Sequence, residues 1–248
     1  MANYSADDVK RLREATAAGM LDCKKALDEA DGDYDKAVEI IRVKGLKGVT
    51  KREGRATSNG LVVAKSAGDI GVMLELNCET DFVAKGDRFQ ALGDELIDHL
   101  LKTKSADVAA FLASEIAPGR TVQQHVDEAN ATLGERIEVR RVTVYEGGPV
   151  GIYLHKTSPD LPPQFVNRDE VPAELIENER RIAEETAREE GKPEAALSKI
   201  VEGRVTGFVK EVSLLEQAFA KDAKKTVQQI LDEAQTAVKA FSRFRVGQ

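Results

Sequence analysis

Two apolar stripes on either side of a glycine–proline turn constrain the fold of this chain more than any other feature. Both recur at helical spacing and have charged flanks, so each helix has only one face to bury. The turn between them is Gly191-Lys192-Pro193, which ends one helix and starts the next. We therefore expect an antiparallel helical hairpin, projecting from the body of the protein over about 172–213. The stripes consist of Leu175, Ile176, Ile182, Ala183 and Thr186, and of Leu197, Ile200, Val201, Val205, Phe208 and Val212.

Two segments in the middle of the chain alternate as β-strands do. Residues 61–65 and 70–78 are predicted to form strands joined by a turn at 66–69. In the second strand Val72, Leu74, Leu76 and Cys78 share one face, and Glu75 and Asn77 lie on the other.

Helices and a second strand pair are expected after this hairpin. Residues 79–86 read as a polar loop, and a helix that carries Phe89 and Leu96 follows it. Shorter helices are predicted near 107–114 and 121–133, the latter with a Thr121/Gln124 capping box. Residues 137–145 and 150–155 resemble another hairpin, so the expected class is α+β.

The ends of the chain complete this picture. Residues 1–45 are predicted to form three short helices, with Leu21 and Leu27 on the apolar stripe of the second and Gly45 ending the third. The basic, glycine-containing run that follows is interpreted as a solvated linker rather than a nucleic-acid contact, because it is short and lacks aromatic residues. A helix at 226–234 and a strand at 238–246 are expected last.

Charge and composition exclude several classes of function. The formal net charge is −7, which argues against a general affinity for nucleic acid. No apolar run approaches a membrane span and no signal pattern begins the chain, so we expect a cytoplasmic protein. Cys23 and Cys78 are expected to be buried free thiols in a reducing compartment.

The chain lacks a recognisable catalytic pattern. His99, His125 and His155 have no neighbour at metal-ligand spacing, and neither a nucleophile motif nor a glycine-rich phosphate loop is present. We therefore predict no catalytic residue, no metal site and no cofactor, and favour a binding protein over an enzyme.

A segment from Asn77 to Lys85 places a large aromatic residue on a polar loop. Periodicity alone favours a Phe82 that folds back into its own core and anchors the next helix. The functional alternative is an exposed anchor for a partner's pocket, flanked by the carboxylate of Asp81.

Several segments closely resemble the bacterial elongation factor Ts family, in the same order along nearly the whole chain. They are VKRLRE at 9–14, AGMLDCKKAL at 18–27, CETDFVAK at 78–85, RRV at 140–142, VEGR at 201–204 and RFRVG at 243–247. The first two are highly specific.

The resemblance implies a fold and a domain order. It implies a ubiquitin-associated-like three-helix bundle at 1–45, joined by a basic linker at 46–56 to a core of two α+β subdomains. The first subdomain would span 57–145, and the second 146–248 with the protruding helical hairpin.

The resemblance also implies a function: binding elongation factor Tu with GDP and speeding the exchange of GDP for GTP. In the family, the loop corresponding to Thr80, Asp81, Phe82 and Val83 pushes into the GTPase and disturbs its magnesium site. The N-terminal module would contact the nucleotide-binding domain through Arg13 and Met20, and the second subdomain would contribute His155. A one-to-one complex, or a dimer of such complexes, is expected, without direct binding to nucleic acid or membrane.

One departure from the family lies at the junction 160–165. The family normally has a further strand and helix there, on the order of thirty residues. Either this chain has lost part of its second subdomain, or the sequence omits residues that belong at this junction. We favour the second explanation, because removing a strand and a helix from a core would expose apolar surface.

An alternative from another class is a helical adaptor or chaperone-like module. It would use residues 1–45 to bind peptides or ubiquitin-like partners, and 80–83 would be dispensable.

Overall fold

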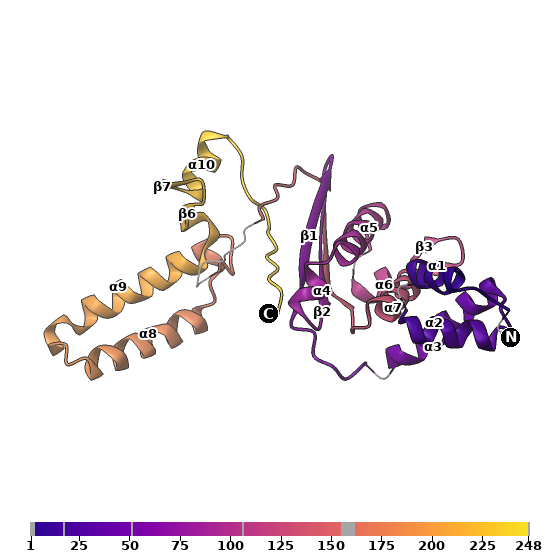
Figure 1. Ribbon diagram of the computed structural model, residues 1–248. Coiled ribbons are helices and arrows are strands. Elements are labelled where there is room, and N and C mark those ends of the chain that lie inside the picture. The colour runs from indigo at the N-terminus through magenta and orange to yellow at the C-terminus, as the bar shows by residue number, and fades with distance from the viewer. Residues whose placement is uncertain (1–2, 17, 51, 106, 155–161, 248) are drawn as a thin grey trace. The chain divides into compact units, whose positions relative to one another are not determined.

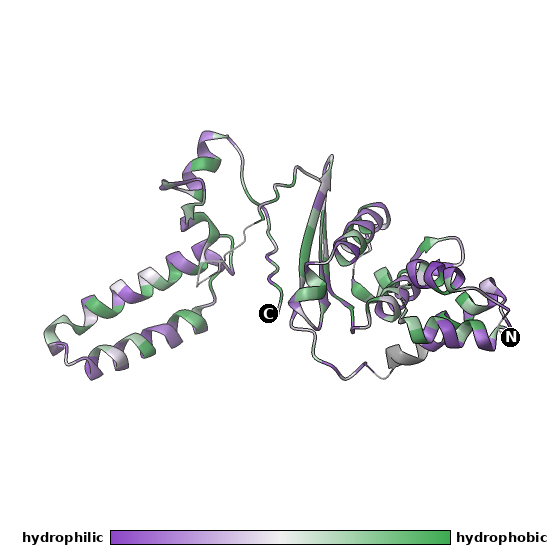
Figure 2. Ribbon diagram, viewed as in Figure 1, coloured by the Kyte–Doolittle hydropathy of each residue, from purple (hydrophilic) through white to green (hydrophobic). Residues whose placement is uncertain are grey.

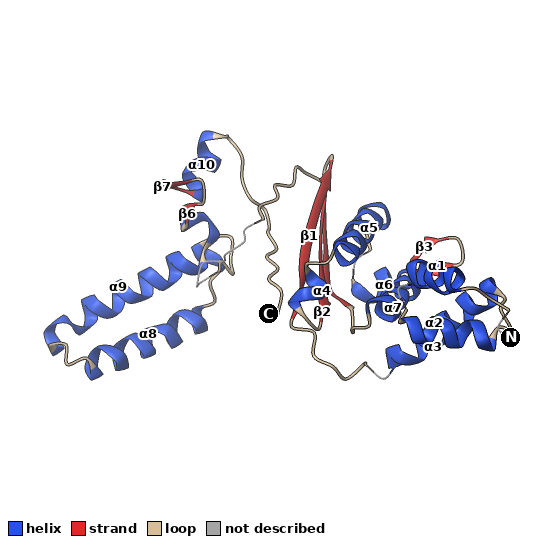
Figure 3. Cartoon of the chain, viewed as in Figure 1, coloured by secondary structure: helices blue, strands red, loops and turns tan. Residues whose placement is uncertain are grey.

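A computed structural model describes residues 3–16, 18–50, 52–105, 107–154 and 162–247 (Figure 1). Contacts divide the chain into two compact units, Met1–Tyr153 together with Arg243–Gln248, and Leu154–Ser242. Both helices and strands are present (Figure 3), and the predicted α+β class is confirmed.

The first unit begins with three helices, which are α1 (Ala6–Thr16), α2 (Met20–Glu29) and α3 (Tyr34–Thr50). The prediction that the third helix ends at Gly45 is wrong, because α3 continues five residues further. Gly45 lies instead where α3 approaches α7 (Val122–Leu133): a Cβ added there would be 2.7 Å from the Cβ of Ala131. A glycine inside a helix usually has a packing reason, and here any larger residue at position 45 would collide with Ala131. The bundle encloses Val9, Leu12, Cys23, Ala26, Leu27, Ala30 and Ala37.

A three-stranded antiparallel sheet with the order β1-β2-β5 follows the bundle. Leu74 pairs with Val63 on one side and Val142 on the other. The predicted hairpin between residues 137–145 and 150–155 is wrong. The first of these segments is β5, which pairs with β2, and the described residues 150–154 are coil. Val150 instead packs on Gly71, leaving no room there for a Cβ. The strands are β1 (Asn59–Ala67), β2 (Ile70–Cys78) and β5 (Glu138–Glu146).

Helices cover one face of this sheet and form the main core with it. α5 packs on β1 and β2 (Figure 1), and the predicted capping box of Thr121 and Gln124 is present at the start of α7. The even-numbered apolar residues of β2 are buried against Phe89, Leu96 and Phe111. The remaining elements around this core are α4 (Asp81–Ala84), α5 (Asp87–Thr103), α6 (Val108–Ala113), β3 (Glu115–Ala117) and β4 (Arg120–Thr121).

The opposite face of the sheet carries a buried ion pair. Glu75 on β2 is fully buried, and its Oε2 lies 2.5 Å from Nε of Arg141. A β-bulge places Arg141 opposite Glu75, because Arg140 has no partner in the register of β2 with β5. The predicted strand at 238–246 is wrong: this segment is coil, yet Arg141 bonds the carbonyl of Arg245 at 3.0 Å and lies 4.4 Å from the ring of Phe244.

The second unit contains the predicted helical hairpin. Its helices are joined at Gly191, whose φ of +71° suits glycine, and hydrophobic and hydrophilic residues alternate along both helices (Figure 2). The buried stripe includes Ala183, Val201, Val205 and Val209. The elements of this unit are η1 (Arg168–Glu170), α8 (Ala173–Glu189), α9 (Glu194–Val212), η2 (Leu214–Glu216), β6 (Ala218–Phe219), β7 (Asp222–Thr226) and α10 (Val227–Glu233).

His99 is a structural residue of the first unit. Its ring is buried beside Phe111, and its Nε2 lies 2.9 Å from Oγ of Ser114. Because the Ser114 hydroxyl donates its proton to the carbonyl of Phe111, Nε2 of His99 must be the donor in this contact. Burial, and then the charge of Lys102, lower the pKa of His99 below its ordinary value.

We expect His99 to make the stability of the fold depend on pH. Its pKa is lower in the folded than in the unfolded state, so the unfolded state takes up the proton first as the pH falls below about 6.5. The free energy of unfolding should therefore decrease below that pH, and His99→Gln should lack this part of the decrease. Urea unfolding of both proteins between pH 5 and 8 checks this, and parallel pH profiles would contradict it.

Candidate partner-binding site

A short helix follows β2 at one end of the sheet (Figure 1). The sequence predicts a loop here, but α4 occupies Asp81–Ala84. Thr80 caps this helix, since its hydroxyl accepts a hydrogen bond from the Val83 amide at 3.3 Å. Four residues are too few for a helical pattern to be seen in the sequence.

The helix separates its side chains into inward and outward sets. Ala84 is buried and Val83 packs against the main core, whereas the side chain of Phe82 is 84% exposed. The interpretation that periodicity favours, a Phe82 folded into its own core, is wrong. An aromatic side chain that stays in solvent contributes no burial free energy to the fold. An exposed aromatic residue of this kind is typical of an anchor for a binding partner.

Asp81 lies beside Phe82 on the exposed side of α4. Its Oδ2 is 2.7 Å from Nζ of Lys85, one helical turn further. The hydrogen bond and charge of Lys85 lower the pKa of Asp81, so the carboxylate is ionised at neutral pH. Both side chains are mostly exposed, and this pair can open when a partner offers another cation.

Two carboxylates form hydrogen bonds that hold the start of α4 in place. Glu135 accepts hydrogen bonds from the amides of Glu79 and Thr80 at 3.1 and 3.0 Å, and from the Thr80 hydroxyl at 2.5 Å. Glu79 in turn accepts from the Arg136 amide at 2.7 Å and from Arg55 at 3.2 Å. The Arg136 amide is the main reason that the pKa of Glu79 is lowered. We name Glu79 and Glu135 the carboxylate clamp; no motif in the sequence pairs them.

Cys78 ends β2 immediately before this clamp. Burial is the main cause that raises the pKa of its thiol to about 11, and the charge of Glu135 adds to it. The thiol is therefore protonated at neutral pH and is a poor nucleophile. Cys23 and Cys78 are both buried free thiols, as expected.

The N-terminal bundle offers a second exposed surface. Arg13 is exposed in the last turn of α1, and Met20 is 54% exposed at the start of α2. Leu21 is 64% exposed, so its predicted place on the buried stripe of this helix is wrong. Its exposure could not be read from spacing, because Cys23, Ala26 and Leu27 suffice to face the bundle core.

The second subdomain gives the least defined part of the candidate site. His155 lies outside the residues that the structure describes. The residues before it, Ile152, Tyr153 and Leu154, have exposed fractions of 41%, 58% and 62%.

The histidines of the described residues have structural partners. Besides the contact of His99 with Ser114, Nε2 of His125 lies 2.7 Å from Glu95. Within the described ranges, no group of three or more His, Cys, Asp or Glu side chains could hold a metal ion. The helices in those ranges are too short or too polar to cross a membrane.

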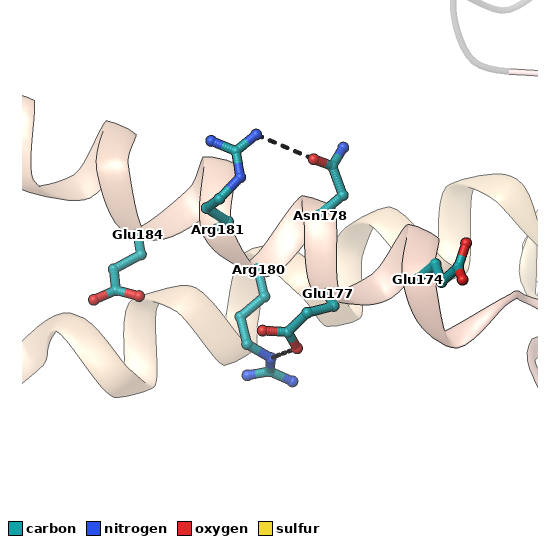
Figure 4. Close-up of a pocket in the computed structure, with 6 residues that line it drawn as sticks. All are labelled: Glu174, Glu177, Asn178, Arg180, Arg181 and Glu184. Atoms are coloured by element: carbon teal, nitrogen blue, oxygen red, sulfur yellow. Dashed lines mark hydrogen bonds and ion pairs between the residues drawn. The ribbon is translucent and has the colours of Figure 1, made fainter.

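A surface hollow of about 450 Å³ lies on one helix of the hairpin. Its six lining side chains all come from α8, and the pairs Arg180–Glu177 and Arg181–Asn178 lie along the helix surface (Figure 4). Solvated ion pairs of this kind are usual on helices, and the hollow does not bring different elements together around a ligand.

Comparison with known proteins identifies relatives along the whole chain. A family model described as elongation factor TS matches residues 79–159 and 160–248. The elongation factor Ts of Streptomyces griseus is 56% identical over 277 aligned positions, and that of Arthrobacter sp. strain FB24 is 54% identical over 278; each alignment covers 100% of both chains.

These alignments are also longer than the chain, which bears on the short junction at 160–165. An alignment of 277 positions leaves 29 of them unmatched in a chain of 248 residues, and the family match breaks between residues 159 and 160. The sequence of 248 residues is therefore shorter than these alignments. Our preference for omitted residues over a lost strand and helix stays a prediction.

Proposed function

Because this chain belongs to the elongation factor Ts family, we propose that it binds elongation factor Tu in its GDP-bound form and accelerates the exchange of GDP for GTP. Family membership makes it a translation elongation factor, and it would act in the cytoplasm. The observation that carries the proposal is the 84% exposed side chain of Phe82, on a helix whose next two residues pack inward.

Phe82 would act as a wedge in the GTPase. Burying a phenylalanine side chain contributes about 1.5–3 kcal/mol, which can stabilise a displaced arrangement of the partner's phosphate-binding elements. Magnesium is among the largest local charges in such a site, so moving the groups that hold it weakens GDP binding. Asp81 would assist as a carboxylate near the water shell of the ion.

The exchange needs no covalent step, so the chain would not be an enzyme. Linkage requires that GDP weaken the binding of the chain by the same factor by which the chain weakens GDP binding. The complex is either one-to-one or a dimer of such complexes, which sedimentation of the purified complex distinguishes.

The other contacts would be divided among the domains predicted above. The bundle, whose third helix extends to Thr50, would touch the nucleotide-binding domain through Arg13 and Met20. The first core subdomain (57–145) would supply the wedge, and the second (146–248) further contacts near His155. Because 29 aligned positions have no counterpart in this chain and the family match is divided between residues 159 and 160, we propose that the first subdomain and the bundle provide most of the activity.

Release of fluorescent GDP from purified elongation factor Tu tests the function directly. Stopped-flow traces with the full chain should show GDP release much faster than the spontaneous rate. A folded chain that leaves the release rate unchanged would refute the proposal.

The bundle surface can be tested by truncating its exposed apolar residues. Met20→Ala with Leu21→Ala should weaken binding to the GTPase by roughly tenfold, the order expected for losing partial burial of two apolar side chains. Stability should change little, because both side chains are already more than half exposed. The concentration of the chain that gives half-maximal GDP release measures the effect.

Val43→Ala is the matched control for this pair, since Val43 is 48% exposed in the same bundle. We expect it to bind as the unchanged chain does. Equal weakening by Val43→Ala, or none by the double change, would remove Met20 and Leu21 from the proposed contact.

A further inference from the structure

We propose that Glu135 is a positioning residue for Phe82, and that its carboxylate determines the direction in which the exposed ring points. This inference rests on the proposed function and adds to it a residue that never needs to touch the partner. Glu135 follows the left-handed cap of α7 at Gly134, more than fifty residues from α4 in the sequence.

The exposed ring cannot hold its own position. With 84% of its side chain in solvent, Phe82 has little packing of its own, and a helix of four residues is too short to be stable by itself. The direction of the ring therefore depends on the two ends of α4. Val83 and Ala84 hold one end against the core, and Thr80 holds the other.

The Thr80 hydroxyl has a single proton, and Glu135 uses it. This hydroxyl donates to Oε1 of Glu135 at 2.5 Å and accepts from the Val83 amide at 3.3 Å. A hydroxyl that donates in a fixed direction has its lone pairs fixed as well. Glu135 thus orients the acceptor that caps α4, through a charge-assisted hydrogen bond.

The second oxygen of Glu135 fixes the backbone at the same place. Oε2 accepts from the amides of Glu79 and Thr80 at 3.1 and 3.0 Å. The Arg136 amide reciprocates by donating to Glu79 at 2.7 Å. The clamp therefore connects the end of β2 to the turn between α7 and β5. Each of these two segments contributes one carboxylate and donates amide hydrogen bonds to the carboxylate of the other.

Such support reduces the number of directions that the ring samples before binding. A wedge that is already oriented loses less conformational entropy on insertion. The rest of the binding surface is unaffected by Glu135. We therefore expect its loss to slow the exchange step more than it weakens the complex.

Glu135→Gln tests this with little change of shape. A glutamine keeps one acceptor oxygen, so it cannot accept from both the hydroxyl and the two amides. We expect the saturating rate of GDP release to fall about tenfold, the order of one lost charge-assisted hydrogen bond. The half-saturating concentration should change much less. Glu115→Gln, an exposed glutamate on β3, is the matched control and should leave both values unchanged.

Substitutions of Thr80 separate positioning from general stability. Thr80→Val removes the hydroxyl that Glu135 orients and should reproduce the loss seen with Glu135→Gln. Combining Thr80→Val with Glu135→Gln should cost less than the sum of the two changes, because they share the hydrogen bond between the Thr80 hydroxyl and Glu135. Full additivity would contradict the proposal.

A second readout does not depend on the GTPase. The chain contains no tryptophan, so Phe82→Trp introduces a single indole whose fluorescence anisotropy reports motion of the exposed side chain. Glu135→Gln in that background should increase fast local motion, and Glu115→Gln should not. If the unchanged chain fails to accelerate GDP release, the proposed function fails, and anisotropy still tests the clamp.

Three further results would overturn the proposal. One is a folded Glu135→Gln chain with unchanged anisotropy. Another is increased motion with an unchanged saturating rate. The third is an equal loss of rate with Glu115→Gln, which would indicate a general effect of charge.

Discussion

Phe82→Ala should reduce the acceleration of GDP release by about 10- to 150-fold, the range that corresponds to 1.5–3 kcal/mol of lost burial in the complex. The fold should hardly notice the change. Phe82 is 84% exposed, and substitutions of exposed residues usually alter the free energy of unfolding by less than about 0.5 kcal/mol. Stopped-flow release of fluorescent GDP and urea unfolding measure the two effects separately.

Val43→Ala is a suitable control, because it also truncates an exposed apolar side chain in the first unit. It should change neither the rate nor the stability. If Phe82→Ala leaves the rate of GDP release unchanged, Phe82 is not the wedge, and the activity must come from the bundle or the rest of the core.

Arg141→Met should lower the free energy of unfolding by about 3–5 kcal/mol, because it leaves the buried Glu75 carboxylate without its cation. The side chain of Glu75 is fully buried, and Arg141 lies 2.5 Å from its Oε2. The same change removes the contacts of Arg141 with Phe244 and with the carbonyl of Arg245. Since small domains have only about 5–15 kcal/mol of stability, urea unfolding should show a large shift.

The neighbouring Arg140→Met provides the matched control. Arg140 is exposed at the bulge of β5, so the same chemical change there should have little effect. Adding Glu75→Met to Arg141→Met should recover much of the loss, because no unpaired charge remains. Equal destabilisation by the two arginine changes would show that the buried pair is not responsible.

Glu75 also shows how far the strand pattern could be interpreted. Alternation correctly places Val72, Leu74, Leu76 and Cys78 on one face, all of them buried in the main core. The same alternation puts Glu75 and Asn77 on the other face, but it does not say what covers them. The partner of Glu75, Arg141, contacts Phe244 and Arg245 in the C-terminal segment, which the sequence alone had suggested to be a strand.

The candidate site was likewise only partly predictable from the sequence. Its position in the chain was found from the segment CETDFVAK and its resemblance to a family. The direction of Phe82 was not, because periodicity alone favoured a buried ring. Leu21 was misplaced for a related reason, since a short amphipathic helix has more apolar residues than its buried face requires.

The amino-acid sequence alone was enough to predict the class of the fold, the helical hairpin, the paired strands β1 and β2 and most of the helices. These depend on the spacing of apolar residues within one segment and on local turn and capping chemistry at residues such as Gly191 and Thr121. Three further features became visible in the folded chain: Phe82 points outward, Glu75 is buried with Arg141, and Glu135 supports Thr80. Each of those outcomes depends on groups that are distant in the chain and meet only when the strands, helices and C-terminal segment pack together, so no local pattern could encode them.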